Sequence, residues 1–252
     1  MTPRLRQTRQ WLLPAALLVA WQLAATAQEG PSILPSPVEI GQTLLETLVS
    51  GRLPADALHT FAAAIASWVI CLLIGIPLGM ALGSAERLRV ALSLFIELLR
   101  PLPAVALIPL AILVFGFSWQ TEITVTVFAS VWPLILASRS GIERMHPRIL
   151  EVVSTLHLRR WHALRCVITP AAFRQILVGA KLSFSLCLVV SVVAEMVGNP
   201  AGLGWGLVSA QEAMRASETF AYLFAIGILG VCANCALDFA VKHLFPGLAQ
   251  GN

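Results

Sequence analysis

Charged side chains are rare in the long apolar runs of this chain, and those that occur there are the first candidates for a chemical role. Lys181 and Glu195 lie in one such run, fourteen residues apart. On a helix of 3.6 residues per turn they share a face but do not touch. Charges in apolar surroundings are costly and commonly functional, although a lysine near the end of a run can also extend to polar surroundings. Both interpretations stay open.

Hydroxyl and guanidinium groups form a second set of candidates. Serine side chains in the same run could donate hydrogen bonds to an oxyanion or to a neighbouring helix. Arg100 stands beside a proline-rich stretch, where it could attract an anion or simply follow the general distribution of positive charge. The candidates for a solute pathway are Arg100, Ser183, Ser185, Ser191 and Glu195.

Motifs of catalysis and phosphate binding are missing from the sequence. There is no G-x-S-x-G and no G-x-x-x-x-G-K-[ST], because the only lysines are Lys181 and Lys242 and neither follows a glycine. Cys232 and Cys235 form one C-x-x-C within an apolar run, with no second pair. We therefore expect no catalytic residue, no metal site and no bound cofactor, so that any ATP used would be bound by a partner.

The composition predicts a membrane protein. Of 252 residues, 58% are hydrophobic and 12% are charged, and the mean hydropathy is +0.82. Ordinary soluble domains are about 45–50% apolar and about 25% charged. This composition argues against a soluble enzyme, a disulfide-rich secreted domain and a nucleic-acid-binding domain. The net charge of +4 is then better explained by basic loops on the cytoplasmic side than by a nucleic-acid partner.

Six apolar runs approach the length of about 20 residues that a helix needs to cross a bilayer. We predict an all-α fold with spans at 11–27, 58–83, 101–117, 123–138, 176–197 and 219–245. The chain would then divide into a first helix and outer segment (1–57), a five-helix core (58–245) and a short tail (246–252). The first run also resembles a cleavable signal ending in A-T-A, but five further spans favour an uncleaved helix.

Basic residues set the predicted orientation. Most arginines fall in segments that share one side if both termini are inside, whereas the outer loops hold only Arg52 and Arg215. We place Glu122 in an outer loop. Near the predicted inner end of the last span, Asp238 and Lys242 are spaced for a local ion pair.

Small residues predict close helix packing. Glycines at 75, 79 and 83 make two overlapping G-x-x-x-G steps, which form a flat stripe on a helix. The stripe could pack within the chain or at a homodimer seam. Glycines at 202, 204 and 206 are expected in an outer loop or re-entrant turn.

The longest predicted inner segment, residues 139–175, contains a short amphipathic pattern. Val152, Val153 and Leu156 fall on one helical face, and Arg159 and Arg160 follow. Such a helix could lie on anionic lipid through its arginines or dock its apolar face into a groove of a soluble partner. The pattern alone does not separate these alternatives.

This segment resembles the cytoplasmic EAA loop of ABC-transporter permeases, in which E-A-A, three residues and a glycine precede a proline by about a dozen residues. The chain keeps Glu151, the spacing and Pro170, and has Val152, Val153 and His157 where that family has two alanines and a glycine. Residues 33–37, 99–112 and 179–205 resemble the permeases for sulfonates, taurine and nitrate. The resemblance covers residues 11–245.

The resemblance implies a type I ABC importer permease in the bacterial inner membrane, with two ATP-binding subunits, a periplasmic substrate-binding protein and a second permease copy. The solute would be a small anion of the sulfonate, taurine or nitrate type. The residues implied to couple to the ATPase are Glu151, Val152, Val153, Leu156, His157, Leu158 and Pro170. The alternatives are a secondary transporter driven by an ion gradient and, more remotely, an intramembrane enzyme.

Overall fold

The computed structural model describes residues 3–26, 34–145, 155 and 160–244, and all regular structure in this part of the chain is helical. The elements are α1 (Pro3–Thr26), α2 (Pro37–Val49), α3 (Arg52–Ser84), α4 (Glu86–Leu99), the 3₁₀ helix η1 (Ala104–Leu107), α5 (Ile108–Phe115), α6 (Trp119–Glu143), α8 (Arg160–Ala163), the π-helix η2 (Leu164–Ile168), α9 (Thr169–Gly198), α10 (Gly202–Glu212) and α11 (Ala216–Leu244). The predicted all-α fold is confirmed.

Within the described ranges, four helices are long and apolar enough to cross a membrane: α3, α6, α9 with the residues just before it, and α11. They coincide with four of the six predicted spans. The apolar part of α1, Leu13–Thr26, is shorter. The third predicted span is not continuous, because α4 and the η1–α5 segment meet at 86°, a bend that a broken span or a re-entrant loop would have. Pro101 and Pro103 lie at the bend, where proline removes backbone donors and resists helical geometry.

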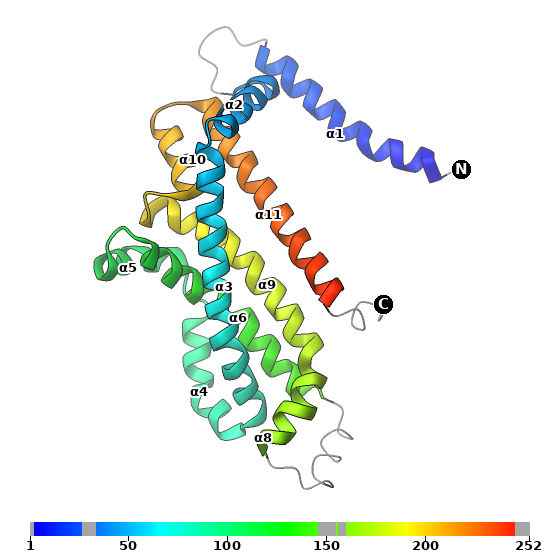
Figure 1. Ribbon diagram of the computed structural model, residues 1–252, viewed down its shortest axis with the longest axis vertical. Coiled ribbons are helices and arrows are strands. Elements are labelled where there is room, and N and C mark those ends of the chain that lie inside the picture. The colour runs from blue at the N-terminus through cyan, green and yellow to red at the C-terminus, as the bar shows by residue number, and fades with distance from the viewer. Residues whose placement is uncertain (1–2, 27–33, 146–154, 156–159, 245–252) are drawn as a thin grey trace.

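The core consists of α3, α6 and α9, which lie side by side in the middle of the molecule (Figure 1). Their close approach depends on glycine. A Cβ at Gly79 would meet the carbonyl oxygen of Ile135 at 2.5 Å, and one at Gly83 would meet that of Arg139 at 2.9 Å. A Cβ at Gly179 on α9 would collide with Ala137. The glycine stripe of α3 therefore packs against α6 within the chain, as one of the two predicted alternatives proposed.

The two ends of the molecule differ. Figure 1 shows α2 and α10 at one end, which we call the cap end, and α4 and α8 at the other, which we call the loop end. At the cap end α10 packs on α3, α9 and α11. Its glycines, predicted in a loop or re-entrant turn, belong to a regular helix, and Gly206 lies against the ring of Tyr222.

Candidate functional site

The predicted ATPase-coupling residues fall mainly outside the described part of the chain. Pro170 lies in the first turn of α9 and is exposed. The other six residues lie outside the described residues, and they are Glu151, Val152, Val153, Leu156, His157 and Leu158.

The three serines of the predicted pathway set form hydrogen bonds between helices. Ser183 donates to the carbonyl oxygen of Ser130 on α6 over 2.7 Å, and Ser185 donates to Oδ1 of Asn234 on α11 over 2.7 Å. Ser191 donates to Oε1 of Glu122 over 2.5 Å. Ser183 and Ser191 are fully buried. Their hydroxyls thus tie α9 to its neighbours, and a role in solute passage stays a prediction.

Lys181 forms an ion pair that the sequence did not suggest. Its Nζ lies 2.5 Å from Oδ1 of Asp238, which joins α9 to α11. The predicted pair between Asp238 and Lys242 is wrong, because the Asp238 carboxylate reaches a cation on the neighbouring helix instead. Local spacing along α11 could not reveal this partner, which is 57 residues away in sequence.

Arg100 lines an open pocket between α4 and α6. The pocket measures about 510 Å³, and Arg139 and Glu97 also line it. Arg139 is engaged by Glu143 over 2.8 Å, whereas Arg100 is exposed and forms no ion pair within the described ranges. This pocket brings one predicted pathway residue together with a second arginine, but it does not include Glu195.

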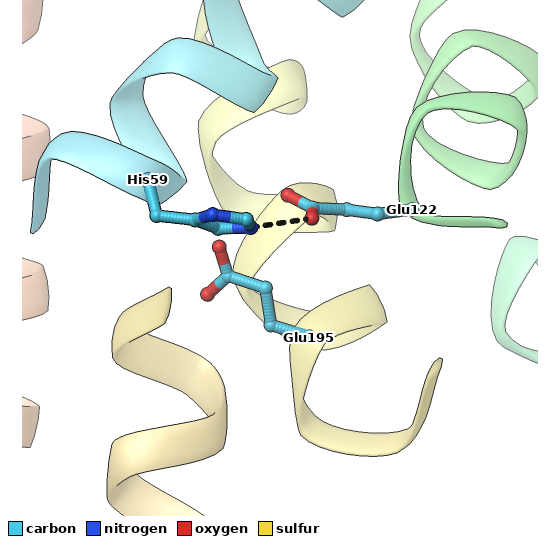
Figure 2. Close-up of side chains that lie close together, drawn as sticks. All are labelled: His59, Glu122 and Glu195. Carbon is cyan, nitrogen blue, oxygen red and sulfur yellow. Dashed lines mark hydrogen bonds and ion pairs between the residues drawn. The ribbon is translucent and has the colours of Figure 1, made fainter. Parts of the chain in front are cut away.

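Glu195 belongs instead to a buried polar cluster at the cap end. His59 from the second turn of α3, Glu122 from the start of α6 and Glu195 from the end of α9 point toward one another (Figure 2). One possible ligand atom from each lies within 4.8 Å of the others. The two carboxylates are completely buried, and the His59 side chain is 30% exposed. Of these three residues, the sequence analysis singled out Glu195 alone as a site candidate.

Glu122 is held by several donors. Besides the Ser191 hydroxyl, Nδ2 of Asn199 donates to its Oε2 over 2.8 Å, and Nε2 of His59 lies 3.2 Å from the same oxygen. Glu122 was predicted in an outer loop, but it occupies the first turn of α6. The partial positive charge of a helix N-terminus favours a carboxylate there.

Glu195 is held from the other side. Its Oε2 accepts hydrogen bonds from the Thr60 hydroxyl over 3.0 Å and from the backbone N–H of Gly204 over 2.8 Å. Thr60 in turn accepts from the N–H of Leu203 over 3.0 Å. Gly202 adopts φ +90°, and a Cβ at Gly202 would collide with the Glu195 carboxylate. The glycine pattern of α10 thus allows backbone donors to reach Glu195.

His59, Thr60 and Asn199 were missed because each stands near the end of an apolar run. Polar residues are ordinary at such a boundary, so their types carried no signal. The cluster forms only when α3, α6 and α9 are packed, since His59 lies 63 residues from Glu122 and 140 from Asn199. Its chemistry is that of an imidazole beside two carboxylates, a set that can hold a cation.

Comparison with known proteins identifies the family. The model for "Binding-protein-dependent transport system inner membrane component" matches residues 75–250. The putative aliphatic sulfonates transport permease SsuC of Bacillus subtilis is 28% identical over 87% of this chain and 80% of its own length. The taurine transport system permease TauC of Escherichia coli is 28% identical, over 92% of this chain and 86% of its own.

The fold agrees with these sequence matches. A chain of the inward-facing MetNI methionine ABC transporter superposes with a TM-score of 0.67 at 16% identity, over 79% of this chain and 97% of its own. This protein therefore belongs to the family of inner membrane components of binding-protein-dependent transport systems. It is a multi-pass permease component of an ABC importer with the type I fold.

Proposed function

We propose that this permease passes a small anion of the sulfonate, taurine or nitrate type. The observation that carries the proposal is the similarity, over most of the chain, to permeases whose names specify aliphatic sulfonates and taurine. Both names denote small solutes that carry a sulfonate group. A pathway for such solutes needs positive charge at a place that solvent can reach.

The pocket beside Arg100 supplies such charge. Arg100 and Arg139 both line it, and Arg100 is exposed without an ion-pair partner among the described residues. A guanidinium group matches the planar oxygens of a sulfonate or nitrate through paired N–H donors. We assign Arg100 to anion attraction on this basis, while the hydroxyls of Ser183, Ser185 and Ser191 serve helix contacts in this conformation.

The energy for transport comes, in this proposal, from two ATP-binding subunits. The sequence has no phosphate-binding loop of its own. Residues 139–175 would dock on the ATPase, with Glu151, Val152, Val153, Leu156, His157, Leu158 and Pro170 making the contact. The loop end then faces the cytoplasm with both termini inside, and the cap end faces a periplasmic binding protein. A second copy of this chain would complete the pathway.

Uptake measurements test the proposal. Cells that express this permease with its binding protein and ATPase should accumulate labelled taurine or an alkanesulfonate, and the ATPase should copurify with the permease from detergent. Uptake should stop on ATP depletion and persist when a protonophore collapses the proton gradient. Uptake that follows the ion gradient instead, with no copurifying ATPase, would support a secondary transporter.

A further inference from the structure

The cluster at the cap end contains more negative charge than its contacts balance. Glu122 and Glu195 are both 0% exposed, yet neither pairs with a lysine or arginine in the part of the chain that the structure describes. Among the described residues, His59 is the one basic side chain in contact with Glu122. Burying two carboxylates is costly unless positive charge accompanies them. The cluster therefore needs compensation, either by a cation or by a proton that the two carboxylates share.

One oxygen of Glu195 provides a second, independent indication of a bound ligand. Oε2 is saturated by Thr60 and Gly204, but Oε1 is buried and has no hydrogen-bond partner among the described residues. Buried carboxylate oxygens are almost always paired. Figure 2 shows the Glu195 carboxylate beside the His59 ring, so the group that carries the unpaired oxygen belongs to the cluster.

The hydrogen-bond contacts of His59 are mutually inconsistent. Its Nε2 lies 3.0 Å from Nδ2 of Asn199 and 3.2 Å from Oε2 of Glu122. A single ring nitrogen cannot accept from the amide and donate to the carboxylate at once. A cation bound at Nε2 removes this conflict when the Asn199 amide is turned to present Oδ1, because the lone pair of the neutral ring and the neighbouring oxygens would then all face the same ion.

The donor set, and the spacing of His59 and Glu122 within it, fit a divalent transition metal. Zinc binds imidazole nitrogen and carboxylate oxygen at about 2.0–2.2 Å, which puts neighbouring ligand atoms about 3.4 Å apart in a tetrahedral site. Nε2 of His59 and Oε2 of Glu122 are 3.2 Å apart, and the Glu195 carboxylate lies within the same 4.8 Å group. Rotating the Asn199 amide by half a turn would offer Oδ1 as a fourth ligand.

We propose that His59, Glu122 and Glu195 bind one divalent transition-metal ion, best matched by Zn²⁺, that joins α3, α6 and α9 at the cap end. This inference does not depend on the solute, and it departs from the sequence-based expectation of no metal site. The partly exposed His59 ring gives the ion a route from solvent. Thr60, Gly204 and Ser191 are positioning groups that orient the two carboxylates.

Metal content measures the site directly. The purified full-length chain, with Cys232→Ser and Cys235→Ser to remove the C-x-x-C, is stripped with EDTA, loaded with ZnCl₂ and desalted. We expect about one Zn²⁺ per chain by elemental analysis. His59→Ala and Glu195→Gln should each reduce the content at least about tenfold. His162→Ala and Glu212→Gln, which change exposed residues outside the cluster, should leave it unchanged.

A spectroscopic measurement avoids dependence on mutant folding. Co²⁺ added to the stripped chain should give the visible absorption of a nitrogen- and oxygen-ligated site, and Zn²⁺ but not Mg²⁺ should abolish it. Zinc content below about a tenth per chain, or zinc that His59→Ala and Glu195→Gln leave in place, would overturn the proposal. A carboxyl pair that shares a proton would then account for the cluster.

Discussion

The backbone N–H of Gly204 donates to Oε2 of Glu195 over 2.8 Å, and this bond fixes α10 against the end of α9. The approach is possible because residue 204 has no side chain. A Cβ there would overlap the carbonyl oxygen of Val192 and lie 2.9 Å from the Cβ of Glu195. The first N–H groups of a helix lack partners within it, so a carboxylate stabilises them.

Adding one methyl group at this contact should destabilise the cap end. We expect Gly204→Ala to lower the free energy of unfolding by about 1–3 kcal/mol, because a Cβ forces backbone atoms apart in a packed interior. Thermal unfolding of the detergent-solubilised chain, followed by circular dichroism, measures the change. Gly227→Ala in α11 is the matched control, since no atom lies within 4 Å of its added Cβ. Equal losses in both variants would contradict this account.

A double-mutant cycle can distinguish the ion pair of Lys181 with Asp238 from the pair of Asp238 with Lys242 that the sequence predicted. Lys181→Met and Asp238→Asn should show an interaction energy of up to about 1 kcal/mol, a modest value because both side chains are partly exposed. Lys242→Met combined with Asp238→Asn should be additive. Chemical denaturation in detergent provides the stabilities, and a larger coupling for Lys242 would reverse the assignment.

Arg100 should affect the affinity for solute more than the amount of protein. Losing one charge-assisted hydrogen bond costs about 1.5–3 kcal/mol, so Arg100→Gln should raise the KM for uptake by about tenfold or more. Arg87→Gln, an exposed arginine of α4 that does not line the pocket, serves as the control. Initial uptake rates over a range of taurine concentrations give both constants, and an unchanged KM in Arg100→Gln would remove the residue from the pathway.

Glu151 should affect coupling without affecting insertion. Glu151→Lys is expected to abolish uptake and to reduce copurification of the ATPase, since a reversed charge repels the basic partner or helix N-terminus that the carboxylate would contact. The membrane fraction should contain the variant at the normal level. Glu86→Lys makes the same charge reversal at an exposed glutamate of α4, and its uptake should be retained. Normal uptake by Glu151→Lys would exclude the coupling role.

The sequence predicted those parts of the fold that depend on composition along a single segment. The runs that became α3, α6, α9 and α11 could be located because a membrane-crossing helix must be apolar throughout. The glycine stripe also predicted a close helix contact. Only the structure shows that the helix in contact with the stripe is α6. The third predicted span, 101–117, includes Pro101 and Pro103 at the bend, and its 86° angle depends on packing that no local pattern encodes.

The polar cluster could not be predicted in this way. Glu122 looked like a loop residue because it closely precedes an apolar run, and His59 looked like a boundary residue for the same reason. Glu122 and His59 form a cluster only because the ends of α3, α6 and α9 lie together, and this proximity is a property of the packed bundle. Glu195 could be singled out because it stands within its run, where water cannot compensate its charge.

At the glycine contacts, α3 and α6 pack without space for a further side chain, and so do α6 and α9. Backbones in such close contact resist sliding. A shift along the helix axis would replace a glycine at the contact by a residue with a side chain, which would collide with the neighbouring helix. These three helices should consequently travel as one rigid body during transport. The hinges must then lie at its borders, with α11 on one side and the sharply bent α4–α5 segment on the other.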